Sequence, residues 1–318
     1  MMKPNPKTKP NSILLFSMVI FLVYIWTFIG CSTYYTARRT TKKITRDMMA
    51  GEGDLKKSIA IIKFENQSYY TNDKIEELFQ EKITETLQSA CTNIHLILPG
   101  DERYPNPLKA PPRLSSGRID NLKLVQVGRL SGIGAIATGS INNVSAYQKK
   151  RGIFWLRDDH AYLQVQIHLE VFDTETGAKL LDENRLEEVE IEEDDYHFIK
   201  EQRQVPIVEI SEKVQFSATL LGEKICDSLV NQSWKSYVVS KEGEKVIISS
   251  GKNAGLQPGD RFEIYDTGKL INGIADERFL LPGKKTGVVQ VTYIHMDKAE
   301  TVVVTDEGIR PGDIVKQQ

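Results

Sequence analysis

Apolar and polar positions follow different periods along the chain, and these periods predict its secondary structure. From about Asp73 to Ala90, apolar residues recur every three to four positions, as on the buried face of an amphipathic helix. From Ala161 to Phe172, apolar and polar residues alternate strictly, as in a strand with one buried face. The middle of the chain is therefore expected to mix helices and strands.

The same criteria predict the other elements of this middle part. Further strands are expected at 58–64, 94–98, 135–141 and 178–191, and further helices at about 120–130 and 210–231. The turn from Asp173 to Gly177 joins two strands into a hairpin, because Asp and Gly supply the side-chain bond and the permissive backbone that a reversal needs. The order of these elements predicts fold class α/β, a mixed sheet with packed helices.

After Ser236 the period changes, and short strands alternate with glycine-rich turns. Strands are expected at 245–249, 260–265, 286–295, 300–305 and 313–316. Such spacing predicts a small β-barrel or sandwich, and we expect the barrel. Two near-repeats lead into Pro-Gly-Asp turns, and we expect their aliphatic residues, Leu256 and Ile309, to plug the barrel. The Gly and Pro of these turns are explained by backbone geometry first.

The start of the chain has the pattern of an export signal. Residues 1–10 carry three lysines and no acid, the stretch from Ile13 to Ile29 is almost wholly apolar, and Gly30 and Cys31 follow. A basic start, an apolar stretch and a small residue describe a secretory signal. The apolar stretch also reaches the lower limit for spanning a bilayer, so an uncleaved, inner-membrane-anchored periplasmic protein is the alternative.

The tetrapeptide Phe28-Ile29-Gly30-Cys31 resembles the lipobox of bacterial envelope lipoproteins, with Phe28 in place of the usual leucine. The resemblance implies cleavage between Gly30 and Cys31, a diacylglycerol on the Cys31 thiol, and acylation of the new amino terminus. Two lipid signals suffice for stable anchoring. Ser32, where an aspartate would favour retention in the inner membrane, implies the periplasmic face of the outer membrane.

Five basic residues between 38 and 46 allow both interpretations of the amino terminus. Beside a lipid anchor, they would lie next to anionic head groups. By the positive-inside rule, they favour the uncleaved helix or a reversed orientation.

Composition and charge narrow the classes of protein. The chain has 41 basic and 43 acidic residues, whereas a dedicated nucleic-acid binder usually has a large basic excess. Charged residues make up 26% and apolar residues 40%, as in ordinary folded proteins. With Cys31 lipidated, Cys91 and Cys226 are left in an oxidising compartment. They form either one disulfide or two buried thiols, and the sequence leaves both open.

Three segments of the middle part, IAII at 59–62, GAIATGSI at 134–141 and FDTETGAKL at 172–180, resemble the CsgG-like/TolB amino-terminal-like family of periplasmic domains. The tail, with GKNAGLQPGDRFEIY and a closing PGDIV, is similar to the carboxy-terminal domain of flagellar assembly protein T. The export signal and lipobox predict a signal peptide at 1–30, and a segment rich in Thr, Lys and Arg predicts a flexible tether at 31–56. The two resemblances imply an α/β domain at 57–235 and a β-barrel domain at 236–318.

The curli secretion pore of the CsgG-like family inserts long hairpins into a membrane, and this chain departs from that pattern. A membrane strand needs an apolar residue at every second position over about 9–11 residues. The candidate hairpin segments, 146–160 and 182–195, are crowded with charges instead. We therefore do not expect a pore.

Signs of catalysis are weak. The five histidines do not have the spacing of a metal site, and His160 and His168 are most simply half-buried strand positions. The pattern G-x-G-x-x-A at 132–137 follows a predicted helix and opens a predicted strand, the reverse of a dinucleotide-binding turn. We predict no enzyme activity, no metal and no cofactor.

Two segments indicate binding. Residues 187–195 form an acidic run, predicted on a surface hairpin, that would attract a basic partner or cations. Phe154 and Trp155 are expected either to form an exposed partner contact or to tuck into the domain. Trp234 follows the last helix and is expected to plug the junction between the two domains.

Together these patterns predict a non-catalytic lipoprotein that docks periplasmic protein partners in envelope or flagellar assembly. A regulator of cell-wall synthesis, which some CsgG-like lipoproteins are, is the alternative function. The sequence names neither the partner nor the oligomeric state.

Overall fold

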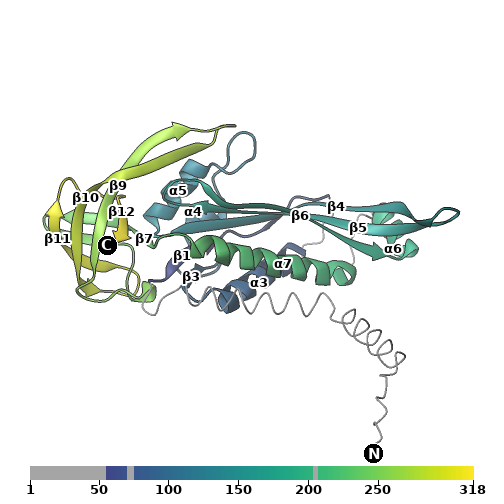
Figure 1. Cartoon of the computed structure of the whole chain (residues 1–318), viewed down its shortest axis with the longest axis horizontal. Coiled ribbons are helices and arrows are strands. Elements are labelled where there is room, and N and C mark those ends of the chain that lie inside the picture. Colours follow the sequence, from purple (N-terminus) through teal and green to yellow (C-terminus); the bar gives the residue numbers. More distant parts are fainter. Residues whose placement is uncertain (1–54, 70–74, 203–206) are drawn as a thin grey trace, which may run out of the picture. The chain divides into compact units, whose positions relative to one another are not determined.

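The computed structural model describes residues 55–69, 75–202 and 207–318 (Figure 1). The chain divides into two compact units, Met1–Met49 and Ala50–Gln318, and all the described residues belong to the second. The predicted signal peptide, the Gly30–Cys31 cleavage site and the lipidated Cys31 lie outside the described residues. Among the described helices, none combines the length and the apolar composition that crossing a bilayer requires.

A mixed sheet forms the centre of the α/β part. Its strands follow the order β3-β1-β4-β5-β6, and the short β2 pairs with β4. β1 lies parallel to both β3 and β4, whereas β4, β5 and β6 form an antiparallel meander. The strands are β1 (Lys57–Ile61), β2 (Glu65–Asn66), β3 (Ile94–Ile97), β4 (Ala135–Ile153), β5 (Leu156–Asp173) and β6 (Lys179–Ile191).

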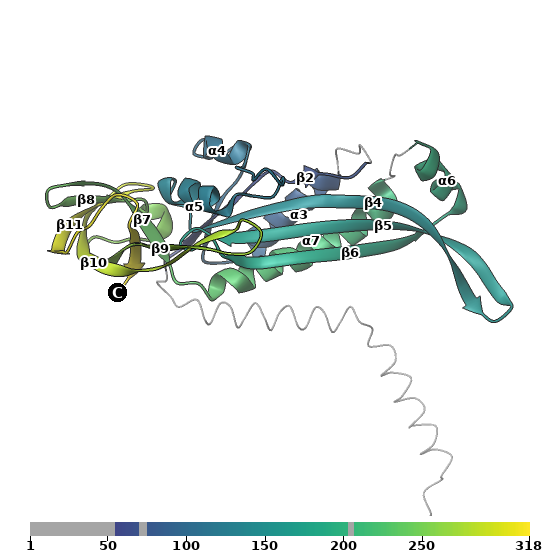
Figure 2. The same cartoon turned by 90° about the horizontal axis from the view of Figure 1, so that it is seen from above.

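Helices cover both faces of this sheet unequally. The helices are α3 (Ile75–Ala90), α4 (Asn106–Lys109), α5 (Asn121–Leu130), α6 (Glu193–Gln202) and α7 (Ile207–Val230). The long α3 and α7 lie along one face, and α4 and α5 lie on the other (Figures 1 and 2). Alternate residues of β5, such as Leu163, Val165 and Ile167, are buried in one core with α3 and α7. The polar positions between them face the other side, most of which stays open.

A disulfide joins the two long helices. Cys91 follows the last residue of α3 and is bonded to Cys226 on α7, with their Cα atoms 5.5 Å apart. The two residues are 135 positions apart in the chain, so the bond closes a long loop. Cross-linking such a loop removes conformational freedom from the unfolded chain.

Removing this disulfide should destabilise the fold. We expect the double variant Cys91→Ala/Cys226→Ala to lose about 2–4 kcal/mol of unfolding free energy, the usual contribution of a native disulfide. Urea unfolding with and without dithiothreitol measures this loss, and dithiothreitol should have no effect on the double variant. A wild-type midpoint that does not respond to the reductant would contradict the expectation.

The tail forms a separate all-β part. Its strands hydrogen-bond in the order β10-β11-β8-β7-β12-β9 and close into a barrel, because β9 also pairs with β10. The strands are β7 (Lys235–Glu242), β8 (Lys245–Ile248), β9 (Arg261–Asn272), β10 (Arg278–Ile294), β11 (Ala299–Asp306) and β12 (Ile314–Gln317), with the short 3-10 helix η1 (Lys252–Ala254) between β8 and β9. We call this part the β-domain. The structure therefore confirms the predicted fold class in two respects: a mixed α/β part with packed helices, and an all-β tail.

Apolar side chains from the turns fill the β-domain. Leu256 and Ile309, one from each near-repeat, are buried in its core. Trp234 belongs to the same core, and its ring centroid lies 5.0 Å from that of Phe262. The glycines of both Pro-Gly-Asp turns have positive φ, 95° at Gly259 and 88° at Gly312, which side chains rarely tolerate.

Several elements differ from the prediction. The short β2, α4, η1 and the helix α6 were not predicted, and β9 and β10 extend beyond the expected strands 260–265 and 286–295 into a long hairpin. β4 runs on to Ile153 instead of ending near 141, because a register shift between Ile141 and Asn143 lets the strand continue past two asparagines. β7 was not predicted. The acidic run 187–195 does not lie wholly on a hairpin, because β6 ends at Ile191 and Glu193 begins α6. Acids in the first turn of a helix are stabilised by its dipole.

The turn after β5 connects the α/β part to the β-domain through buried charges. Lys235 Nζ, at the start of β7, lies 2.5 Å from Asp173 Oδ1 and 3.2 Å from Glu175 Oε2. Glu175 also accepts a hydrogen bond of 2.6 Å from Lys316 Nζ on β12. Arg129 of α5 donates from Nε to the Thr174 carbonyl oxygen at 3.0 Å. The DTETG turn is thus the polar joint between the two parts.

Candidate functional site

The antiparallel hairpin of β4 and β5 extends beyond the rest of the sheet. The last residue of β6, Ile191, pairs with Ala161, and past this point β4 and β5 pair only with each other. Figure 2 shows this hairpin projecting past the end of β6. We call residues 149–160 the hairpin tip. Because no third strand supports it, the tip offers both its faces and its end to a partner.

The end of the hairpin tip is apolar and exposed. Ile153, Phe154 and Trp155 have 72%, 78% and 86% of their surface accessible. The rings of Phe154 and Trp155 lie 6.0 Å apart between centroids. Phe154 has a φ of 52°, a left-handed conformation that is uncommon outside glycine. Of the two arrangements expected for Phe154 and Trp155, the structure has the exposed one.

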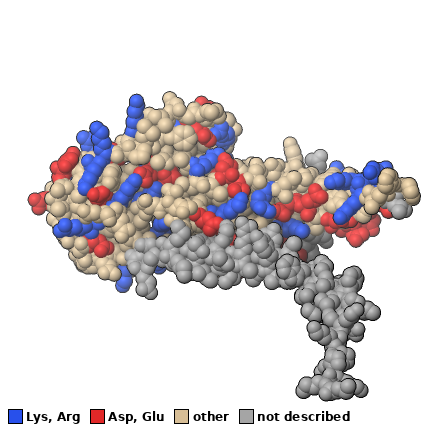
Figure 3. All heavy atoms as spheres, in the orientation of Figure 1, with Lys and Arg blue, Asp and Glu red and all other residues tan. Residues whose placement is uncertain are grey.

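Charged side chains follow directly behind this apolar end. The tip carries four basic residues and two acidic ones: Lys149, Lys150, Arg151, Arg157, Asp158 and Asp159. On the face drawn in Figure 3, basic side chains gather just behind the uncharged end of the hairpin. Among the described residues, Lys149, Lys150 and Arg157 form no ion pair, whereas Arg151 Nη1 lies 3.2 Å from Glu190.

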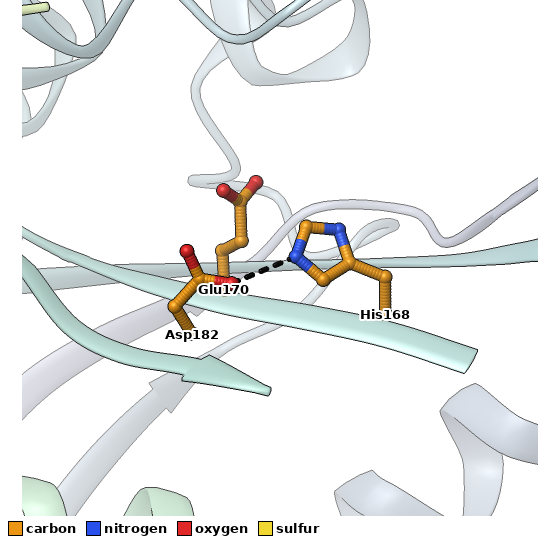
Figure 4. Close-up of side chains that lie close together, drawn as sticks. All are labelled: His168, Glu170 and Asp182. Carbon is orange, nitrogen blue, oxygen red and sulfur yellow. Dashed lines mark hydrogen bonds and ion pairs between the residues drawn. The ribbon is translucent and has the colours of Figure 1, made fainter. Parts of the chain in front are cut away.

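A second candidate is a polar cleft on the open face of the sheet. Its volume is about 530 Å³, and residues of β4, β5, the 113–121 segment and the β9–β10 hairpin line it. Two of its lining residues, His168 and Glu170 on β5, form a cluster with the neighbouring Asp182 on β6. One potential ligand atom of each lies within 4.8 Å of the others (Figure 4). His168 Nε2 lies 2.9 Å from Asp182 Oδ1. Imidazole and carboxylate groups are common metal ligands.

Lys179 shows why this cluster is better described as an ion-pair network than as a metal centre. Its Nζ lies 2.7 Å from Glu170 Oε1 and 2.7 Å from Asp182 Oδ2, so one ammonium bridges both carboxylates. Burial raises the pKa of Asp182, but hydrogen bonds from Lys179 and His168 outweigh it and hold the pKa below its usual value. A metal ion would have to displace Lys179, and we assign none.

The other charges that line the cleft are paired as well. Arg113 Nη2 lies 2.5 Å from Glu65 Oε1, and Arg118 Nη2 lies 2.6 Å from Glu277 Oε1. Glu277 belongs to the turn between β9 and β10, so the second pair ties the β-domain to the α/β part. Each of these charges already has an ion-pair partner within the protein, which leaves the hairpin tip as the stronger candidate.

Comparison with known families finds a match for the tail. Residues 243–317 match the family of the C-terminal domain of flagellar assembly protein T. The match runs through β8 to β12 and confirms the similarity predicted for this part. No curated protein matches the chain. The similarity of residues 57–235 to the CsgG-like family stays a prediction.

Solved structures of similar proteins share little sequence with this chain. The hypothetical protein CT253 from Chlamydia trachomatis is 13% identical, with a TM-score of 0.31, over 54% of this chain and 98% of that chain. Lipoprotein GNA1162 from Neisseria meningitidis is 11% identical, with a TM-score of 0.27, over 46% and 94%. The LpoB C-terminal domain from Salmonella enterica is 16% identical, with a TM-score of 0.25, over 45% and 91%. Likenesses this low support no statement about function.

Proposed function

We propose that this protein is a non-catalytic envelope lipoprotein that docks protein partners in envelope or flagellar assembly. The observation that carries the proposal is the match of residues 243–317 to the C-terminal domain of flagellar assembly protein T. The lipobox resemblance supports a lipid on Cys31 and a place on the periplasmic face of the outer membrane. The paired charges of the polar cleft favour a structural role there over catalysis.

The matched domain also offers an apolar surface for a protein partner. The hairpin of β9 and β10 exposes four aliphatic side chains: Leu270, Ile271, Ile274 and Leu281. Ile274, at the turn, is 88% exposed. Exposed apolar side chains gathered on one element mark interaction sites more often than scattered ones do. We therefore place the protein-docking surface on this hairpin.

A crosslinking experiment in cells tests this placement. A photo-crosslinking amino acid at Ile274 of the full chain should give one or a few discrete adducts with envelope or flagellar proteins, identified by mass spectrometry. The same amino acid at Glu85, an exposed position on α3, is the matched control and should give none of these adducts. Identical adducts from both positions, or none from Ile274, would contradict the proposal.

A further inference from the structure

We infer that the hairpin tip inserts shallowly into an anionic bilayer surface and forms a second, non-covalent membrane contact. This deepens the prediction that Phe154 and Trp155 make a contact, because it names what they contact. The inference rests on the proposed function in one respect, since the envelope location supplies the bilayer.

The order of residues along the hairpin matches the layers of a membrane surface. Ile153, Phe154 and Trp155 form the end, and cations follow on both strands. An interfacial element buries its apolar part about 5–10 Å into the boundary between head groups and acyl chains. At about 3.3 Å per residue, Lys150 lies roughly 10 Å behind Ile153 along the strand. With the apolar end buried, the cations would therefore lie at the level of the lipid phosphates.

The side-chain types also fit this position. Tryptophan is enriched at membrane interfaces, where its ring meets apolar chains and its N–H meets water. Lys149, Lys150 and Arg157 form no ion pair among the described residues, so they are available to lipid phosphates. Residues 149–160 carry a net charge of +2 from four basic and two acidic residues, and one of the four, Arg151, is paired with Glu190 of β6. Each Lys or Arg near an anionic surface contributes about 1 kcal/mol of attraction, or about fivefold in binding.

The charges behind the apolar end limit how deep the hairpin can go. A Lys, Arg or Asp at the bilayer centre costs at least about 2.5–3.5 kcal/mol. Arg151 and Asp158 are paired in register only two positions from the turn pair of Ile153 and Leu156. Spanning the bilayer would carry these charges through its centre, so insertion stops at the head groups. This agrees with the expectation that the protein is not a pore.

A lipid anchor would make even weak binding by the tip effective. The chain from Cys31 to Leu55, the first described residue, can span at most about 80 Å when extended. Tethering to the same bilayer would raise the effective concentration of the tip at its surface. The tip then sets how the body is held near the membrane, although Cys31 provides most of the affinity.

A fluorescent probe at Ile153 tests the inference. With Cys31 acylated and Cys91 bonded to Cys226, an Ile153→Cys variant of the processed protein has one free thiol, which takes an environment-sensitive fluorophore. On vesicles that contain phosphatidylglycerol, we expect a blue-shifted emission that lipid-borne quenchers reduce. On vesicles of phosphatidylcholine alone, the shift should be much smaller. The same fluorophore at Glu85, an exposed position on α3, is the control and should keep the emission of a probe in water.

Variants of the tip separate the two contributions. In the labelled protein, Phe154→Ser/Trp155→Ser should abolish the shift, because the apolar end is lost. Lys149→Gln/Lys150→Gln should weaken the contact about fivefold per lysine at low salt and less at high salt. These side chains are exposed, so circular dichroism should show an unchanged fold.

The outcomes keep this inference apart from the proposed function. A probe at Ile153 that stays in water while the protein floats with anionic vesicles overturns the inference alone. A shift that appears only after periplasmic proteins are added also overturns it, in favour of a protein partner. If mass spectrometry finds no acyl chain on Cys31, the proposed anchor fails. The same probe on an unacylated Cys31→Ser/Ile153→Cys variant, in which position 153 again carries the only free thiol, is then read at high vesicle concentration and still tests the tip.

Discussion

Replacing Cys31 by alanine should abolish fatty-acid labelling of the protein and remove it from the outer-membrane fraction. The lipobox resemblance implies that the Cys31 thiol carries the diacylglycerol and that cleavage before this residue creates a further site for acylation. Each buried CH₂ contributes about 0.8 kcal/mol of membrane affinity, and two lipid signals make anchoring stable. Without the thiol, the precursor should keep residues 1–30 and its full mass.

Palmitate labelling, intact mass and density-gradient fractionation measure this result together. Ser32→Ala is the matched control, since it changes the neighbouring residue but keeps the thiol, and it should be labelled and cut as the wild type is. A full-length, unlabelled wild-type protein would contradict the expectation and favour the uncleaved helix. An alanine variant that still fractionates with the outer membrane would contradict it as well.

The sequence predicts most of the sheet, because a strand that is buried on one face alternates apolar and polar residues. Alternation from Ala161 to Phe172 marks β5, and its apolar positions do face α3 and α7. Its polar positions, among them His168 and Glu170, line the open face and the cleft. His168 was assigned to a strand, but its neighbour Asp182 comes from the next strand. The register of the predicted hairpin could have indicated this contact, because it places Glu170, two residues after His168 on the same face of β5, opposite Asp182.

The joint between the α/β part and the β-domain could not be predicted in the same way. The DTETG segment is recognisable as a turn, because the Asp side chain can hydrogen-bond to the nearby backbone and Gly tolerates the turn's backbone conformation. Its partners are not local, since Lys235 is 62 residues from Asp173 and Lys316 is 141 residues from Glu175. No period or spacing marks such pairs. The exposure of Phe154 and Trp155 was likewise undecided, because it depends on β6 ending before the tip.

Replacing Lys235 by methionine should lower the free energy of unfolding by about 3–5 kcal/mol, which is the usual cost of removing one partner of a buried ion pair. The Lys235 and Asp173 side chains are only 7% and 5% exposed, so the variant leaves the Asp173 and Glu175 carboxylates buried without this ammonium. Methionine has a similar length, which limits the change in packing. Urea unfolding at pH 7 measures the loss.

The loss should shrink in acid, which separates an effect of charge from one of shape. In the wild type, burial raises the pKa of Asp173, but the Lys235 ammonium and the hydrogen bonds of the turn outweigh it and lower the pKa. The stability that this ionised carboxyl contributes is present above about pH 4 and lost as the pH falls through its lowered pKa. In the variant, burial still acts while the Lys235 ammonium is gone, so the pKa of Asp173 rises relative to the wild type and protonation at low pH relieves part of the penalty.

The gap between wild type and Lys235→Met should therefore be largest at pH 7 and smaller near pH 4. Lys82→Met is the matched control, because it removes an ammonium that lies 2.9 Å from Glu85 on the surface of α3. Exposed pairs of this kind contribute about 0–1 kcal/mol, so this variant should unfold close to the wild type at both pH values. If Lys235→Met behaves like Lys82→Met, or if its deficit is the same at both pH values, the buried charges do not hold the two parts together.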